Sequence, residues 1–180
     1  MDQYAWCAPE GRCLMIQFKI TSRLLGSIRQ DLARPHRFAR ERVGFVSARL
    51  SSANGNLWVL AREYRPVADG DYLDDRSVGA MMGPEAIRKA LQWAMSERVA
   101  IFHIHTHHGR GQPGFSGVDL REQAKFVPTF FQIAPRCPHG ALVLSDDSAY
   151  GNIWLAGNRG HKVISAFVQV GNPLNFWQTI

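Results

Sequence analysis

Two histidines and one carboxylate near the middle of the chain have a spacing that suits a metal ion. Four of the seven histidines fall within residues 103–108. His105 and His107 are separated by one residue, so on a β-strand both side chains point to the same face. Asp119 follows after a loop and adds a carboxylate. Three such ligands leave a fourth position open, which is typical of a catalytic zinc site.

A second carboxylate, Glu41, lies upstream at the start of a predicted strand. A zinc hydrolase needs a general base that takes a proton from the attacking water and returns it to the leaving group. The apolar residues 43–46 follow Glu41, and Gly44 among them allows another group to approach the backbone closely. Ser116 lies three residues before Asp119 and can cap the helix that is predicted to begin there.

Together these residues form the pattern Glu-x-x-Gly, then His-x-His and, after a loop, Ser-x-x-Asp. The pattern resembles the JAMM/MPN+ (Mov34/PAD-1, JAB) metalloproteases, zinc isopeptidases that act on ubiquitin and its relatives. The resemblance implies that His105, His107 and Asp119 bind one Zn²⁺ per chain. It also implies that Glu41 is the general base, acting through the zinc-bound water, and that Ser116 stabilises the oxyanion.

The neighbouring histidines have other predicted roles. His103 lies on the same strand face as His105, so these two could instead form the ligand pair. The family spacing to the Ser-x-x-Asp motif favours His105 with His107, which leaves His103 under the site. His108 stands where the family usually has Pro, and we expect it in a loop near the substrate groove. Residues 109–114 of that loop are predicted to border the channel.

The small size of the chain resembles stand-alone bacterial JAB-type deconjugating enzymes. The implied reaction is hydrolysis of the bond after the C-terminal tail of a ubiquitin-like protein, in conjugates or in fusions, including those of bacterial conjugation and antiphage operons. Residues 65–82 are predicted to be an exposed insertion loop that helps to grip this partner. Two alternatives stay open, namely a peptidase that trims a sulfur-carrier protein and a non-catalytic MPN scaffold.

Length and composition indicate one soluble domain over residues 1–180. A chain of 180 residues with 46 % hydrophobic and 20 % charged residues can bury a sizeable core. The sequence has no apolar run of about 18 residues, so we expect no membrane partner. It has no signal-peptide pattern either. Cys7, Cys13 and Cys137 are odd in number and scattered, which favours a reducing cytoplasm.

Two other functions can be weighed against the residues. The net charge of +6 allows nucleic-acid binding, but the excess lies mainly between Arg23 and Arg42, without a recognition motif or an aromatic ladder. We interpret that stretch as a basic surface for solubility or for an acidic protein partner. A zinc deaminase would need His-x-Glu and Pro-Cys-x-x-Cys, which are missing. We predict a buried Cys137 and a surface His139 rather than half of a second zinc site.

Hydrophobic periodicity and turn signals predict an α/β order after an irregular tail at residues 1–12. Helices are predicted from a cap at Thr21 or Ser22 to before Pro35, over 84–97 and over 119–131. Strands are predicted over residues 14–20, 42–50, 57–64, 99–107, 140–144, 152–157 and 162–170. The predicted architecture is a mixed β-sheet with helices on both faces. It resembles the cytidine-deaminase-like fold of the JAMM family.

Overall fold

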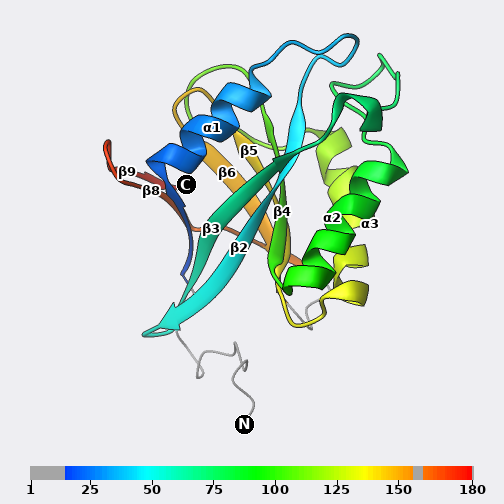
Figure 1. Ribbon diagram of the computed structural model, residues 1–180. Coiled ribbons are helices and arrows are strands. Elements are labelled where there is room, and N and C mark those ends of the chain that lie inside the picture. Colours follow the sequence, from blue (N-terminus) through cyan, green and yellow to red (C-terminus); the bar gives the residue numbers. More distant parts are fainter. Residues whose placement is uncertain (1–14, 156–159, 180) are drawn as a thin grey trace.

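The computed structural model describes residues 15–155 and 160–179 (Figure 1). Nine strands form one mixed sheet, accompanied by three α-helices and a short 3-10 helix. In chain order the elements are β1 (Ile16–Thr21), α1 (Ser22–Leu32), β2 (Val43–Ala53), β3 (Asn56–Pro66), η1 (Asp69–Asp71), α2 (Pro84–Glu97), β4 (Ala100–Thr106), α3 (Gly117–Ile133), β5 (His139–Leu144), β6 (Ala149–Trp154), β7 (His161–Val163), β8 (Ala166–Val170) and β9 (Asn175–Gln178). The mixed α/β class that the sequence predicts is therefore confirmed.

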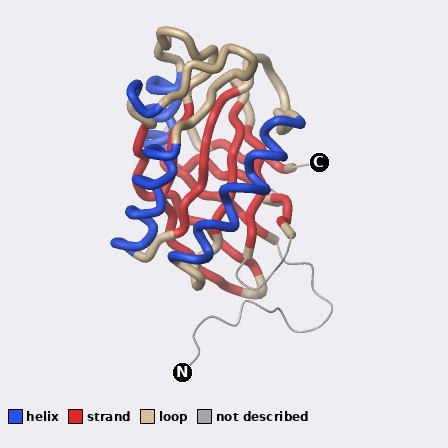
Figure 2. The backbone as a smooth tube through the Cα atoms, turned by 90° about the vertical axis from the view of Figure 1, so that its right-hand side faces the viewer, coloured by secondary structure: helices blue, strands red, loops and turns tan. Residues whose placement is uncertain are grey.

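The strands follow the order β7-β6-β5-β4-β2-β3-β1-β8-β9 across the sheet. Strand β1 runs parallel to β3 and β8, and β4 runs parallel to β5, whereas the other neighbours are antiparallel. Figure 2 shows the strands as one continuous layer with helices beside it. The connection from β4 through α3 to β5 matters most for function, because it carries the predicted metal ligands.

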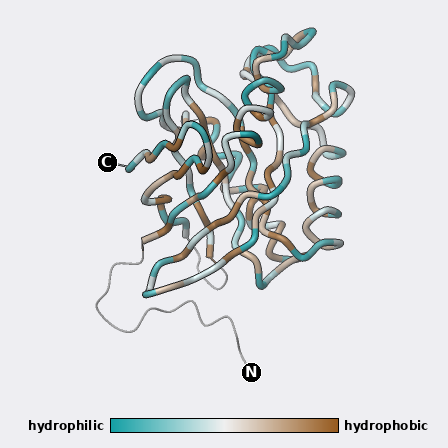
Figure 3. The backbone as a smooth tube through the Cα atoms, turned by 60° about the vertical axis from the view of Figure 1, so that its left-hand side comes forward, coloured by the Kyte–Doolittle hydropathy of each residue, from teal (hydrophilic) through white to brown (hydrophobic). Residues whose placement is uncertain are grey.

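Alternate residues of the central strands enter two separate hydrophobic clusters. Val46 of β2 and Phe102 of β4 pack in one cluster with the buried side chains of α1. Phe45 and Ile101 pack in the other cluster with α2 and α3. Figure 3 shows that hydrophobic residues gather along the strands. In residues 15–155 and 160–179, no helix is long and apolar enough to cross a membrane.

Local signals explain where several elements begin and turn. The side chain of Thr21 accepts a hydrogen bond from the backbone N–H of Leu24 at 3.2 Å and caps α1, as predicted. Pro84 occupies the first turn of α2, where its missing N–H has no cost. Asn54 and Gly55 both have positive φ angles and form the tight turn between β2 and β3.

Two predictions about the chain are corrected, and one strand was missed. Residues 65–82 are not simply an exposed loop, because Val67 is 4 % and Tyr72 6 % exposed and both pack in a core cluster. The predicted strand 162–170 is divided into β7 and β8, since backbone N–H groups between them bond to two different strands. Strand β9 was not predicted. The N-terminal tail, Cys7 and Cys13 lie outside the described residues.

Candidate metal centre

Two neighbouring strands bring His105, His107 and Glu41 together. Strands β2 and β4 are antiparallel, and Val43 pairs with His105. Glu41 lies two residues before Val43 and His107 two residues after His105, so both extend from this end of the strand pair. Glu41, His105 and His107 each offer a ligand atom, and these atoms lie within 4.8 Å of one another. The structure therefore contains a group that can hold a metal ion.

The first turn of α3 adds Asp119 to this group. The side chain of Ser116 accepts a hydrogen bond from the Asp119 backbone at 3.2 Å, and the Asp119 carboxylate accepts one from the Ser116 backbone at 2.7 Å. This reciprocal capping box fixes both residues at the start of the helix. Sequence reasoning predicted the cap from Ser116, and the structure confirms it.

Distances between the candidate ligand atoms can be compared with the geometry of a bound metal ion. The Nε2 atoms of His105 and His107 are 3.2 Å apart, and oxygens of Asp119 lie 3.5 and 3.4 Å from them. Around a tetrahedral ion with bonds of about 2.0–2.1 Å, ligand atoms are about 3.3 Å apart. The two Asp119 distances are close to this value, although they run to different oxygens of the carboxylate. Glu41 lies within 4.8 Å of the same two histidines, so two carboxylates adjoin the histidine pair.

The two candidate ligand histidines differ in exposure. His105 is 2 % exposed, whereas the side chain of His107 is 30 % exposed at the end of β4. The ring of His105 packs between those of His103 and Phe115, at centroid distances of 5.5 and 6.1 Å. Its Nδ1 atom has no hydrogen-bond partner among the described residues. Packing on the strand therefore orients the Nδ1 side of this ring, while Nε2 faces His107 and Asp119.

Local electrostatics keep Asp119 ionised. Burial alone would raise the pKa of the Asp119 carboxyl. Hydrogen bonding to His105 and Ser116, together with the charge of His105, outweighs burial and holds that pKa well below its usual range. An ionised carboxylate is the form that binds a cation.

Glu41 is held in place by its neighbours on both sides. The backbone N–H groups of Arg40 and Glu41 donate to the carbonyl of Gly79 at 2.8 and 3.1 Å. A Cβ atom on Gly79 would lie 2.6 Å from Cδ of Glu41, so the carboxylate rests directly against this glycine. The next residue, Arg42, is 3 % exposed and donates to Asp69 at 2.7 Å. Sequence reasoning missed both Gly79 and the buried Arg42.

The basic stretch between Arg23 and Arg42 is thus only partly a solvated surface. Besides Arg42, the guanidinium of Arg29 donates to the backbone carbonyl of Ser145 at 2.6 Å. The close approach predicted at Gly44 is also present, because the ring of Tyr64 occupies the space that a side chain there would need. Arg42 and the close approach of Tyr64 to Gly44 fix the start of β2, and with it the position of Glu41.

A groove of about 740 Å³ contains the candidate centre. One wall is the segment 77–82 and the other is α3, including Val118 and Phe126. Glu41, His105 and Asp119 line the groove between these walls, as do His107 and Ser116. The predicted insertion loop therefore contributes a wall of the site itself.

The loop after β4 differs in part from its prediction. His108 is an exposed loop residue next to His107, which lines the groove, whereas residues 109–114 are not among the lining residues in the described part of the chain. The loop 109–114 leans towards the turn between β5 and β6, where the Gly111 backbone N–H donates to Asp147 at 2.7 Å and Ser145 donates to the Gly111 carbonyl at 2.6 Å. Local glycines suggested a free loop, but these distant partners hold it.

His103 lies under the site, as predicted. Its ring is 8 % exposed and lies against the rings of Phe45 and Phe126, at centroid distances of 5.8 and 5.4 Å. Burial, helped by the nearby His105, lowers the pKa of His103 to about 3, so the ring is neutral near neutral pH. The structure therefore gives the register of His105 with His107 better geometry than that of His103 with His105.

His139 was predicted to lie at the surface, and this prediction is wrong. His139 is fully buried and stacks on Phe130. Its Nδ1 accepts from the backbone N–H of Ile101 at 3.2 Å, and its Nε2 lies 3.3 Å from the carbonyl of Ala134. Both ring nitrogens are thus engaged by backbone, so His139 is a structural residue. Cys137 is a half-buried free thiol.

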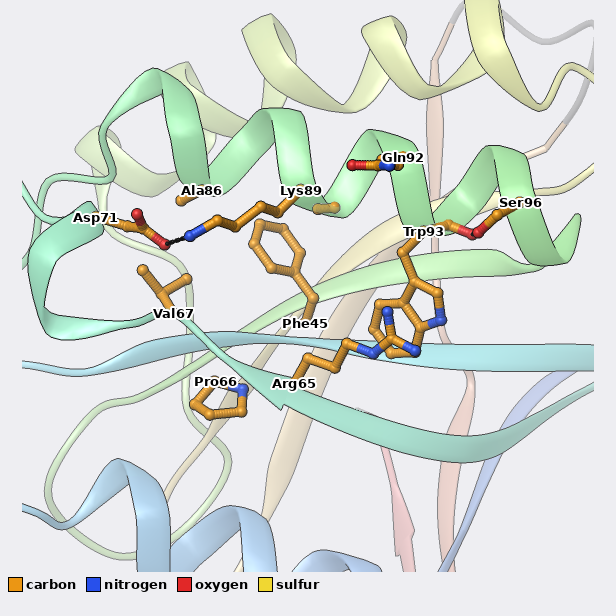
Figure 4. Close-up of a pocket in the computed structure, with 11 residues that line it drawn as sticks. Phe45, Arg65, Pro66, Val67, Asp71, Ala86, Lys89, Gln92, Trp93 and Ser96 are labelled. Atoms are coloured by element: carbon orange, nitrogen blue, oxygen red, sulfur yellow. Dashed lines mark hydrogen bonds and ion pairs between the residues drawn. The ribbon is translucent and has the colours of Figure 1, made fainter.

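A second pocket, of about 380 Å³, lies along α2 (Figure 4). Phe45 projects into its centre, with Lys89 and Arg65 on either side. Lys89 pairs with Asp71 at 2.7 Å, and Arg65 stacks on the Trp93 ring at 3.9 Å. Both cationic side chains of this pocket are therefore already paired within the protein. The candidate metal centre lies in the other groove.

Comparisons with known proteins add little to this geometry. No protein-family model matches the sequence, and no curated protein matches it. Among solved structures, the chain is similar to the STIL N-terminal domain of Trichoplax adhaerens, with a TM-score of 0.36 and 10 % identity. The match covers 74 % of this chain and 39 % of that one. A likeness this weak carries no functional argument, so function is argued from the site.

Proposed function

We propose that the protein is a zinc-dependent isopeptidase of the JAMM/MPN type, which hydrolyses the bond after the C-terminal tail of a ubiquitin-like protein. One observation carries the proposal. The Nε2 atoms of His105 and His107 and the Asp119 carboxylate converge within 3.5 Å, beside the carboxylate of Glu41. The packing of α1 in one core cluster, and of α2 and α3 in the other, supports the helix-flanked JAMM-type fold.

His105, His107 and Asp119 would hold the zinc ion. Bound there, zinc acidifies water and polarises the carbonyl that is attacked. Glu41 accepts the proton of the attacking water and then delivers it to the nitrogen of the leaving amine. Ser116 uses its hydroxyl oxygen as the acceptor of the helix cap, which leaves the hydroxyl hydrogen to donate to the developing oxyanion.

The groove suits an extended chain as substrate. It lies between the segment 77–82 and α3, and its lining combines apolar side chains such as Val78, Met82 and Ile87 with the candidate centre and with polar and charged residues of α3. Tails of ubiquitin-like proteins often end in Gly-Gly, and residues without side chains can pass closely by a recessed metal. The rigid hold on Glu41 by Gly79 and Arg42 supports a catalytic rather than a scaffolding role.

A cleavage assay tests the proposal. Zinc-loaded protein is mixed with fusions in which a reporter follows the C-terminal Gly-Gly of ubiquitin-like proteins, and the products are followed on a gel. We expect cleavage after the tail, inhibition by phenanthroline, and no cleavage by Glu41→Gln protein that carries zinc. If zinc-loaded wild-type protein cuts none of these fusions, the proposal is wrong.

A further inference from the structure

The floor of the groove contains buried polar side chains that the proposed chemistry does not use. His103 and Gln123 both line the groove and are 8 % and 2 % exposed. Within the described part of the chain, Nε2 of His103, Nε2 of Gln123 and Oδ1 of Asn152 have no hydrogen-bond partner. Leaving buried polar atoms unpaired is costly, so such atoms call for a specific explanation.

These side chains belong to one row across the sheet. His103 of β4 pairs with Ala141 of β5, and Ala141 pairs with Asn152 of β6. The side chain of Asn152 donates to Oε1 of Gln123 at 3.2 Å, which ties α3 to this row. Ala141 presents only a methyl group between the two polar side chains. His103 and Gln123 therefore present unpaired atoms at the groove floor, and Asn152 lies behind them in contact with Gln123.

This floor lies one step below the candidate metal centre. His103 precedes His105 by two strand residues, and Gln123 follows Asp119 by about one helical turn. Each step covers about 6–7 Å. Both steps lead the same way, because β4 and β5 are parallel neighbours and α3 must return between them. The floor is thus within reach of a side chain next to the bond at the metal centre.

We propose that His103 and Gln123, with Asn152 behind them, form a subsite for the carboxamide of a Gln or Asn side chain beside the cleaved bond. The inference rests on the proposed peptidase function of the same groove. The unpaired atoms are a donor, Nε2 of Gln123, and an acceptor, Oδ1 of Asn152. If the nitrogen and oxygen of both side-chain amides are exchanged, one donor and one acceptor are still unpaired. A carboxamide satisfies either arrangement.

The surroundings favour a neutral ligand group over a charged one. The rings of Phe45 and Phe126 flank His103, and no formal charge lies among the three polar side chains of the floor. A carboxylate or ammonium group there would lose its hydration, and none of these three side chains offers it an opposite charge. An apolar side chain would leave the floor unpaired, and sites built to hydrogen-bond a ligand reject analogues that lack the bonding group.

Peptide binding tests the subsite separately from catalysis. Non-cleaving, zinc-loaded Glu41→Gln protein is titrated calorimetrically with peptides that contain Gly-Gly. The two positions that flank the bond carry Gln or Leu in turn. At one position we expect the Gln peptide to bind about ten- to hundredfold more tightly than the Leu peptide. The added pair Gln123→Leu and Asn152→Leu should abolish this preference and raise Tm, because both unpaired atoms disappear.

Two further variants complete the design. Val118→Ala, on the groove wall away from the polar floor, should weaken binding of the Gln and Leu peptides equally. His103→Phe fits between the flanking rings and should also reduce the preference for Gln, which provides a test if the double variant does not fold. Equal affinities for the Gln and Leu peptides at both positions, or a preference that survives these changes, would overturn the subsite.

The outcomes also separate the subsite from the proposed function. Gln-dependent binding to the groove without cleavage of any fusion by wild-type protein would support the subsite and refute the peptidase. Cleavage of a fusion with no preference between Gln and Leu would support the peptidase and refute the subsite.

Discussion

Gly79→Ala is expected to reduce turnover by about 100-fold while metal binding is kept. The added methyl group would lie 2.6 Å from Cδ of Glu41 and 2.7 and 2.9 Å from its oxygens, whereas ordinary contacts begin at 3.4 Å. The backbone of residue 79 cannot retreat without losing its bonds to Arg40 and Glu41. The carboxylate must therefore move by about 0.8 Å, and a misplacement of about 1 Å costs about 10²-fold.

The assay compares cleavage rates and zinc content of the wild type, Gly79→Ala and Gly70→Ala. Gly70 is the matched control, because a Cβ atom there meets nothing within 4 Å. We expect normal zinc content in all three proteins and a loss of turnover only in Gly79→Ala. Turnover within about threefold of the wild type in Gly79→Ala would refute the positioning of Glu41 by this glycine, and loss of zinc would make Glu41 a ligand.

Further predictions concern the ligands, the catalytic groups and a structural histidine. His105→Ala should lose zinc by elemental analysis. Glu41→Gln should keep zinc but cut at least about 10²–10⁴-fold more slowly, and Ser116→Ala should lower kcat with a loss of about 3 kcal/mol in transition-state stabilisation. Thiol-blocking reagents should not stop cleavage, because the half-buried thiol of Cys137 takes no part. Burial lowers the pKa of His139 to about 4, below the unfolded value near 6.5. The unfolded state therefore takes up the proton first. Stability should fall by about 3 kcal/mol between pH 6.5 and 4, measured by urea unfolding of metal-free protein, and less in His139→Gln.

Contradictory results for these predictions are distinct. Full zinc content in His105→Ala would show that His105 is not a zinc ligand. Normal cleavage by Glu41→Gln would show that another residue is the general base. An unchanged pH dependence in His139→Gln would mean that His139 is not buried and neutral as described.

Much of the fold could be predicted because its signals are local. Thr21 predicts a helix cap, Pro84 predicts the first turn of a helix, and Asn54-Gly55 predicts a tight turn. Each signal depends on the backbone preferences of only one or two residues. Alternating hydrophobic residues then fix which face of each strand is buried. The capping box of Ser116 and Asp119 is local in the same sense.

The features that sequence reasoning missed depend on distant partners. His139 was predicted to lie at the surface because its hydrogen bonds with the backbone of Ile101 and Ala134 form only in the folded chain. The loop 109–114 was predicted to be flexible because its hydrogen bonds to the turn between β5 and β6 cannot be recognised in the sequence. Tyr72 anchors the segment after β3 through the backbone of Val43. None of these pairings leaves a periodic or compositional trace.

The candidate site shows the same division. His105, His107 and Asp119 could be selected from spacing, because a strand, a loop and a helix start bring them together in sequence order. The support of Glu41 by Gly79 could not, because these residues are 38 positions apart and meet only in the folded sheet. The polar floor of the groove at Gln123 was not predicted, for the same reason.

The most direct test of the central claim is a crystal structure of zinc-loaded protein, with anomalous data collected at the zinc edge. The account predicts one ion per chain, about 2.0–2.2 Å from Nε2 of His105, Nε2 of His107 and one oxygen of Asp119. The Glu41 carboxylate should lie within hydrogen-bonding distance of the fourth position, without binding the ion. An ion bound elsewhere, or one bound directly by Glu41 with Asp119 unbound, would contradict it.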